Sequence, residues 1–314
     1  MQDVSPISPE QRAAHRDPAH ELGHLRLHER AWEIVKRIAI GVYSDGFIHA
    51  GNLAYLALVS LFPFFIVTAA LAHALGRGPD TLMAIDSFLR TLPPSIRTLL
   101  RPPITDVLAQ RTGSLLWLGG LVGLWTAASF IETIRDILRR AYGRAYSKPF
   151  WHYRLWSVAI IIGAVILTLV AFTLQLVLTG LEQFVVHLVP VSNDVIGWIG
   201  WTRLAPGATL FFALYLLFYS LTPTKYRRAK CPKWPGALFT AVWWVTTTMA
   251  LPWVLAKLGG YDRTYGSLAG VIIALFFFWL VGFGLVIGAQ LNAALAETPE
   301  RGVRDTAAKA DREG

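Results

Sequence analysis

Long stretches without a charged side chain constrain this fold more than any other feature of the sequence. Six stretches carry no Asp, Glu, Lys or Arg for at least 20 residues: 46–76, 112–131, 155–181, 204–224, 234–256 and 264–296. A helix that crosses the hydrocarbon layer of a membrane needs roughly 20 apolar residues, because it covers about 30 Å at about 1.5 Å per residue. The pattern therefore predicts an all-α, polytopic membrane protein with six transmembrane helices.

The composition agrees with a membrane protein, and the termini differ from the middle of the chain. Charged residues make up 16% of the sequence, against about 25% in a typical soluble domain. The first 45 residues are polar and lack a short apolar region, so we expect no cleavable signal peptide. Cys231 is the single cysteine, which excludes a disulfide within the chain. We expect a disordered tail over 1–17, one membrane domain over 18–296 and a cytoplasmic tail over 297–314.

Lys and Arg are unevenly divided between the two sides that six spans would create. Segments 1–45, 132–154, 225–233 and 297–314 hold 21 of them, and the alternate segments hold 8. Because cytoplasmic loops carry an excess of Lys and Arg, we expect an inner-membrane protein with both termini in the cytoplasm. The net charge of +9 then reflects juxtamembrane runs that attract anionic lipid headgroups, and we expect no nucleic-acid partner. The oligomeric state stays open.

The segment before the first span holds an amphipathic pattern and a metal-type motif. Apolar residues recur at helical spacing over 18–39, which predicts an interfacial helix on the inner leaflet. At its start, His20 and His24 belong to HELGH, which fits the H-E-x-x-H zinc pattern of metallopeptidases. About 45 residues precede the first span, too few for the core of a catalytic domain. We therefore expect no metal site, no cofactor and no enzymatic activity.

The connection between the first two spans is long and interrupted by proline pairs. Apolar stripes over 82–92 and 99–108 are broken at 93–94 and 102–103. They predict short amphipathic helices that lie on the outer surface or fold over the bundle. Simple packing and a lid over a cavity both remain open for these helices.

The first and second spans carry polar residues that need partners in a membrane. At 100° per residue, Asn52, Tyr55 and Pro63 share one face of the first span, and Ser60 lies about 80° away. Because hydrocarbon offers no hydrogen-bond partner, this face is predicted to point into the bundle, with a bend at Pro63. Two interpretations stay open, namely hydrogen bonds between helices and a solute pathway.

The inner end of the second span and both ends of the sixth span add further candidates. They are Thr126, Ser129, Glu132, Arg135, Tyr265, Gly266, Ser267, Gln290 and Asn292. Glu132 and Arg135 are three residues apart, which suits either a surface pair or an inner gate. Gly284, Gly288 and Asn292 are spaced four apart, a spacing that lets helices approach closely.

Six segments together resemble the YihY/BrkB family of bacterial inner-membrane proteins, once labelled ribonuclease BN. The segments are LAYLALVSLFPFF at 53–65, LWTAAS at 124–129, RRAYG at 139–143, PGALFTAVWW at 235–244, YGSLAG at 265–270 and GAQLNA at 288–293. The resemblance implies six spans and a transport-like role. The family often has Glu where this chain has Gln290, so a role that needs that charge is not carried over.

These observations favour a transporter or exporter of an amphipathic or lipid-like solute. No acid or base falls near the middle of a span, and ion-coupled carriers usually keep one there. A non-transporting scaffold that organises lipids or other proteins is the alternative. A metallopeptidase or a ribonuclease is not supported by the residues.

Overall fold

The computed structural model describes residues 7–14, 27–74, 113–146, 149–166, 205–228, 231–258 and 268–296, with 86, 89–90, 97–98 and 101–102 from the long connection. Every regular element in these ranges is a helix. The elements are α1 (Pro9–Ala14), α2 (Leu27–Ala74), α5 (Gly113–Tyr142), α8 (Ala205–Leu221), α9 (Thr224–Arg228), α10 (Trp234–Leu258) and α12 (Ala269–Leu295). A further apolar helix covers Phe150–Ile166. The described part of the chain therefore confirms the predicted all-α class.

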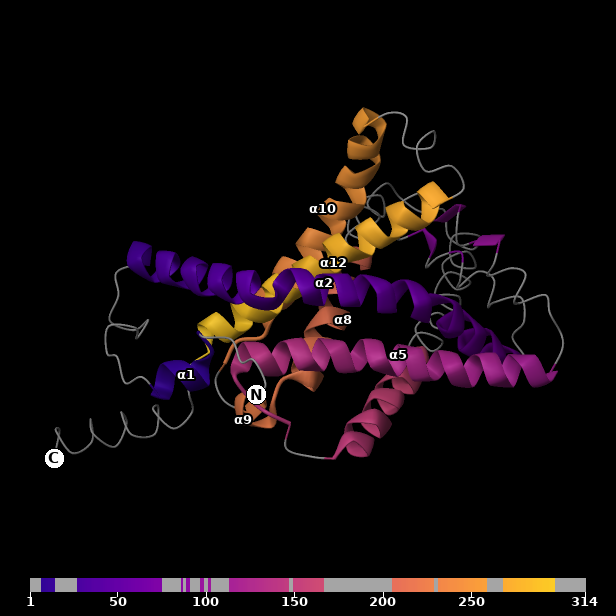
Figure 1. Cartoon of the computed structure of the whole chain (residues 1–314), viewed down its shortest axis with the longest axis horizontal. Helices are drawn as coiled ribbons and strands as arrows, with labels where there is room; N and C mark the ends of the chain where they lie inside the picture. Colours follow the sequence, from indigo (N-terminus) through magenta and orange to yellow (C-terminus); the bar gives the residue numbers. More distant parts are fainter. Residues whose placement is uncertain are drawn as a thin grey trace, which may run out of the picture.

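Helix α12 lies at the centre of the bundle (Figure 1). It packs against α2, α10 and α5, while α8 packs mainly against α10. Much of its length is buried, and many of the buried positions are Ala or Gly. Small side chains let three neighbours approach one helix at the same time. The most apolar segment of the chain thus became the element that the others surround.

Helix α2 is one continuous helix of 48 residues, which corrects our prediction of a separate interfacial helix before the first span. The chain has no proline between residues 27 and 62, so nothing in this range removes a backbone hydrogen bond of the helix. At about 1.5 Å per residue the helix is about 72 Å long, more than twice the thickness of the hydrocarbon layer. Part of α2 must therefore extend beyond that layer.

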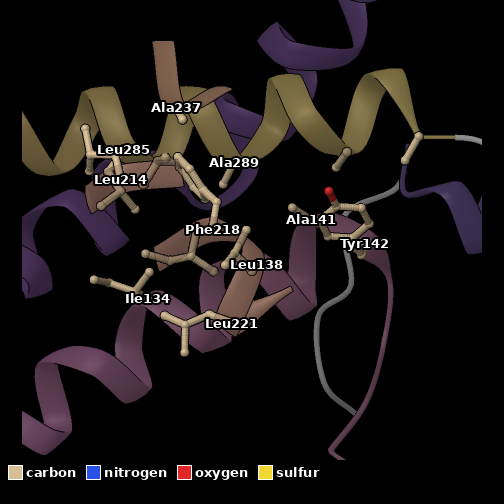
Figure 2. Packing of buried hydrophobic residues seen from close by; sticks show 14 of the residues in the cluster. Ile134, Leu138, Ala141, Tyr142, Leu214, Phe218, Leu221, Ala237, Leu285 and Ala289 are labelled. Atoms are coloured by element: carbon tan, nitrogen blue, oxygen red, sulfur yellow. The ribbon is translucent and has the colours of Figure 1, made fainter. Parts of the chain in front are cut away.

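The buried side chains form two clusters along α12. The larger cluster joins the C-terminal halves of α5 and α12 to α8 and the start of α10 (Figure 2). Its centre holds Phe218 of α8 against Ile134 and Leu138 of α5. The smaller cluster surrounds Phe277 of α12 and includes Leu89 from the long connection. Leu89 shows that this connection folds over the bundle at that point, while most of its predicted helices lie outside the described residues.

Large apolar side chains are exposed on the outward faces of several helices, as expected for a protein in lipid. On α10, a stripe of exposed large side chains runs along one side of the helix: Trp234, Leu238, Val242, Met249 and Trp253. Exposed apolar surface on this scale is rare on soluble monomers and marks contact with a membrane or a partner. Two described helices, Trp234–Lys257 and Ala269–Leu295, are long and apolar enough to cross a membrane.

The count of six spans is not confirmed. Three other predicted stretches overlap shorter apolar helices in the described residues, namely Gly46–Ser60, Phe150–Ile166 and Gly207–Leu221. The remaining parts of these stretches extend into residues whose side chains or backbone lie outside the described ranges. The structure therefore supports a helical membrane protein without fixing the number of crossings.

Candidate functional site

Hydroxyl side chains follow one face of α5 and meet α2. Thr126, Ser129 and Thr133 each donate a hydrogen bond to the carbonyl oxygen four residues earlier, at 2.9, 3.1 and 3.0 Å. This bond satisfies the hydroxyl donor inside its own helix. Asn52 of α2 lies opposite, and its amide donates a long hydrogen bond of 3.5 Å to the hydroxyl oxygen of Thr133. The α2 and α5 candidates thus meet at one helix contact.

The other candidates on the first span lie in different surroundings. Tyr55 is 59% exposed, whereas Ser60 is buried and donates to the carbonyl oxygen of Ala57 at 3.2 Å. Helix α2 continues past residue 63, but the side chain of Pro63 lies outside the described residues. Asn52, Tyr55 and Val59 are exposed, so this face does not point into the interior of the described bundle as we predicted. The bend at Pro63 and the pathway role of this face remain predictions.

Glu132 forms an ion pair with Arg154 on the Phe150–Ile166 helix, with 3.0 Å between Oε2 and Nη1. The same guanidinium donates to the hydroxyl of Ser129 at 3.0 Å and to the carbonyl oxygen of Trp125 at 2.6 Å. Its central carbon lies 3.8 Å from the centre of the Trp125 ring, a cation–π contact. One buried arginine therefore holds two consecutive apolar helices together.

Arg135 does not pair with Glu132, the partner that its three-residue spacing suggests. It is buried and donates to the carbonyl oxygen of Tyr153 at 3.3 Å. Arg139, one turn later, donates to the hydroxyl of Tyr153 at 2.8 Å and to the carbonyl oxygen of Ala145 at 2.6 Å. Its guanidinium carbon lies 4.8 Å from the ring centres of Tyr146 and Tyr153. Through these hydrogen bonds, both arginines stabilise the turn that leads into the next helix.

The two amides near the end of α12 bind different helices. Asn292 accepts a hydrogen bond from the backbone N–H of Gly236 at 2.8 Å and donates to the carbonyl oxygen of Lys233 at 3.1 Å. Gly236 lies in the first turn of α10, where backbone N–H groups lack partners within the helix. Gln290 donates to the carbonyl oxygen of Gly41 in α2 at 3.4 Å. For these two residues, the contacts match hydrogen bonding between helices.

Helices α10 and α12 approach closely where the four-residue spacing predicted it. A methyl group added at Gly284 would overlap the ring of Trp243. One added at Gly288 would overlap the hydroxyl of Thr240 and lie 2.7 Å from the carbonyl oxygen of Gly236. The glycines therefore permit this contact, and the packing interpretation of the spacing is confirmed.

Part of the tail that we predicted to be disordered forms the short helix α1. Ser8 caps it, since its hydroxyl accepts from the backbone N–H of Gln11 at 3.3 Å, and Pro9 occupies the first helical position, where proline is favoured. Glu10 accepts from the hydroxyl of Tyr226 at 2.8 Å and lies 3.1 Å from the ammonium of Lys225. Burial raises the pKa of Tyr226, so the hydroxyl stays protonated and donates to this carboxylate.

Two arginines bind the carbonyl oxygens at the end of α12. Arg12 of α1 donates to Ala296 at 2.7 Å and to Ala293 at 3.2 Å. Arg37 of α2 donates to Ala294 at 3.2 Å. The last carbonyls of a helix lack partners and carry the negative end of its dipole, so cations stabilise them.

Sequence reasoning missed Arg154, Arg139 and the residues of α1. A signal for Arg154 was present, because Glu132 follows the uncharged stretch 112–131 and Arg154 precedes the stretch 155–181. Opposite charges at the adjoining ends of consecutive spans can meet across a short turn. The sequence Ser8-Pro9-Glu10 also carries the signals of a helix N-terminus, namely a capping serine followed by proline at the first helical position.

Some candidates lie outside the described residues, namely Tyr265, Gly266, Ser267 and the HELGH segment with His20 and His24. Within the described ranges, no group of three His, Cys, Asp or Glu side chains is placed to hold a metal ion.

Apolar outer faces and two helices that are long and apolar enough to cross a membrane indicate a helical membrane protein. This chain belongs to the family described as Virulence factor BrkB, whose sequence profile matches residues 44–313. The match confirms the resemblance drawn from the sequence motifs.

Similar proteins carry two kinds of name. The Putative ribonuclease-like protein YfkH of Bacillus subtilis (strain 168) is 26% identical over 80% of this chain and 90% of its own length. The UPF0761 membrane protein PSHAa0171 of Pseudoalteromonas translucida (strain TAC 125) is 25% identical over 81% of this chain and 84% of its own length. A UPF0761 membrane protein of Vibrio campbellii is 24% identical over 80% of this chain and 77% of its own length. No solved structure matches the chain.

Proposed function

We propose that this protein crosses the cytoplasmic membrane six times, with both termini inside, and moves an amphipathic or lipid-like solute. The uncharged stretches support six crossings, and the excess of Lys and Arg in alternate segments supports the orientation. In this orientation the C-terminal ends of α5 and α12 lie on the cytoplasmic side.

The observation that carries the transport proposal is the polar face shared by α2 and α5. Asn52, Thr133 and Ser129 follow one another along this contact, and Ser129 leads to the pair of Arg154 and Glu132. Large apolar side chains beside these polar groups are exposed, among them Val59, Val122 and Trp125. A solute with a polar head and an apolar tail would find partners for both parts there. Polar groups in a span usually mark such a path or a helix contact.

A non-transporting scaffold is the second candidate, and the amides of α12 favour it. Gln290 and Asn292 are both buried and bind neighbouring helices. Such bonds fix a bundle and need no pathway. The distinction therefore rests on Asn52, which is exposed on α2, whereas Gln290 and Asn292 on α12 are buried.

The substitution Asn52→Leu tests the proposal, because it keeps the side-chain volume roughly similar and removes the amide. We expect protein abundance to hold while the function lost in deletion cells is not restored. A comparison of lipids and metabolites between deletion and wild-type cells supplies that readout. Helix contacts of this kind contribute about 0.6–2 kcal/mol, so a purely structural role would lower abundance and leave transport by the remaining protein intact.

Thr248→Val is the matched control, since Thr248 donates to the carbonyl oxygen of Trp244 in its own helix and lies on α10. It removes a polar group from an apolar helix away from α2 and α5. Restoration by this control but not by Asn52→Leu supports the pathway. Full restoration by Asn52→Leu contradicts it.

A further inference from the structure

The elbow where α5 turns into the Phe150–Ile166 helix holds more cations than carboxylates. The described cations are Arg135, Arg139, Arg140, Arg144 and Arg154, and Arg144 lies 3.8 Å from a carboxylate oxygen of Glu10. Glu132 pairs with Arg154 at 3.0 Å, and Asp136 pairs with Arg140 at 2.9 Å. Among the described residues, Arg135 and Arg139 bind carbonyl and hydroxyl oxygens and form no ion pair with a carboxylate. Two positive charges at this elbow are therefore not balanced by the described part of the chain.

Several donors of these arginines have no acceptor in the described part of the chain. They are Nη2 of Arg135, Nε of Arg139 and Nε of Arg154, and all three atoms are buried. One buried acceptor at the elbow, Oε1 of Glu132, also lacks a partner, so the unmet donors outnumber it. Arg135 is only 4% exposed and Arg154 only 5%. A buried donor without a partner costs about 1–3 kcal/mol, and more when the group is charged. Unmet donors of this kind point to an acceptor that carries several oxygen atoms.

The elbow is surrounded by exposed aromatic side chains. Trp125, Phe150, Trp151 and Trp156 are each about half exposed or more. Trp side chains gather at the boundary between hydrocarbon and water. The uncharged stretch of α5 ends at residue 131, one turn before Arg135. On the six-span topology proposed above, the arginines lie at the depth of the lipid headgroups.

We propose that Arg135 and Arg139, together with the hydroxyl of Tyr153, bind the phosphate group of an anionic membrane lipid. Guanidinium groups match phosphate oxygens with several charge-assisted hydrogen bonds. The two arginines are one turn apart and both contact Tyr153, so one phosphate can reach both. The exposed faces of Trp151 and Leu155 offer apolar surface for the acyl chains. This site holds a lipid whether or not the protein transports one.

The first test uses the wild-type chain, purified in a mild detergent and washed with detergent free of phosphate. Native mass spectrometry after addition of phosphatidylglycerol should show one lipid that remains bound at collision energies that remove phosphatidylcholine. Equal loss of both lipids would overturn the proposal. Competition by millimolar inorganic phosphate without any lipid preference would assign the site to free phosphate and would overturn the lipid assignment.

The second test compares variants that each remove one positive charge from the same helix end. Arg135→Gln and Arg139→Gln should weaken retention of phosphatidylglycerol roughly tenfold or more, because each removes charge-assisted hydrogen bonds. Arg140→Gln is the matched control, since its guanidinium pairs with Asp136, and it should retain the lipid. An equal loss in Arg140→Gln would show a general charge effect and overturn the site.

Arg139 also stabilises the turn after α5, so the Arg139→Gln protein can lose binding because that turn is disturbed. Arg135→Lys keeps the charge and removes the planar guanidinium, and it should still bind the lipid more weakly than the wild type. Unfolding temperatures of all variants, measured without added lipid, identify those that fold as the wild type does. Retention equal to the wild type in a folded Arg135→Gln protein would contradict the proposal.

Discussion

Gly143 ends α5 in a backbone conformation that other residues adopt only at a cost. Its φ is +73°, and it follows the last helical residue, Tyr142. The backbone N–H of Arg144 donates to the carbonyl oxygen of Arg139 at 2.8 Å, and that of Gly143 donates to Arg140 at 3.1 Å. This pair of bonds is the Schellman motif, in which glycine is preferred. The positive φ of this motif thus explains why glycine occupies position 143 in the RRAYG segment.

We expect Gly143→Ala to destabilise the protein. The left-handed conformation costs a residue with a Cβ about 1–2 kcal/mol, and the added methyl group would also overlap the hydroxyl of Ser8 in α1. Thermal unfolding of the purified protein in detergent measures the effect. Gly120→Ala is the control, since nothing lies within 4 Å of its added methyl group, and it should unfold at the wild-type temperature or above. A Gly143→Ala protein as stable as the wild type would refute this account of the turn.

At the scale of elements, the contact between α10 and α12 depends on residues that have almost no side chain. Gly236 of α10 faces Gly288 of α12, and an added methyl group at either would meet a carbonyl oxygen of the other helix. Asn292 then caps α10 from the next turn. The close approach of the two backbones and the hydrogen bond of the Asn292 side-chain amide therefore stabilise the same helix contact.

Gly288→Ala should separate these two helices and lower stability by about 1–3 kcal/mol, the usual cost of overpacking. Backbone atoms cannot move aside as the end of a flexible side chain can, so the strain has to be taken up by the helices. Protein abundance in membranes and the unfolding temperature in detergent both report the loss. Gly163→Ala, on the Phe150–Ile166 helix, has open space around its added methyl group and is expected to gain slightly from helix propensity. Equal behaviour of the two variants would argue against the close contact.

At the scale of the whole molecule, distant parts of the chain meet at the end of α12. Arg12 and Arg37 both bind its last carbonyl oxygens, and Glu10 connects α1 to α9 through Tyr226 and Lys225. Figure 1 shows α1 near this end of α12. Segment 7–14, helix α9 and the end of α12 therefore lie on one side of the bundle. The six-span topology also groups these segments on one side, and the assignment of that side to the cytoplasm stays a prediction.

Reporter fusions test that orientation. A reporter at Gly314 should show a cytoplasmic location, and one near Asp194 should show the opposite side, because three predicted spans separate these positions. A phosphatase that is active only outside the cytoplasm, and a fluorescent protein that folds only inside it, supply complementary signals. Signals from the same side at both positions would disprove the six-span topology.

Much of the element structure could be predicted from the sequence, because helices in lipid follow local hydropathy. Stretches 234–256 and 264–296 correspond closely to α10 and α12, and the spacing of Gly284 and Gly288 indicated a close helix contact. The predicted helix boundaries were wrong where the sequence has no helix-breaking residue. Residues 27–74 form one helix, since amphipathic and apolar segments can follow each other without a change in backbone hydrogen bonding.

By itself, the sequence determined the helical class, the membrane environment and the family, because each depends on local composition or on ordered motifs. The tertiary structure alone decided the partners of the polar groups. Glu132 has Arg135 one turn away, yet its ion pair is with Arg154, and Arg12 binds Ala296 at the far end of the chain. Spacing along one helix shows which face a side chain occupies. It cannot show which other helix lies there, since that depends on how all the apolar faces are buried together.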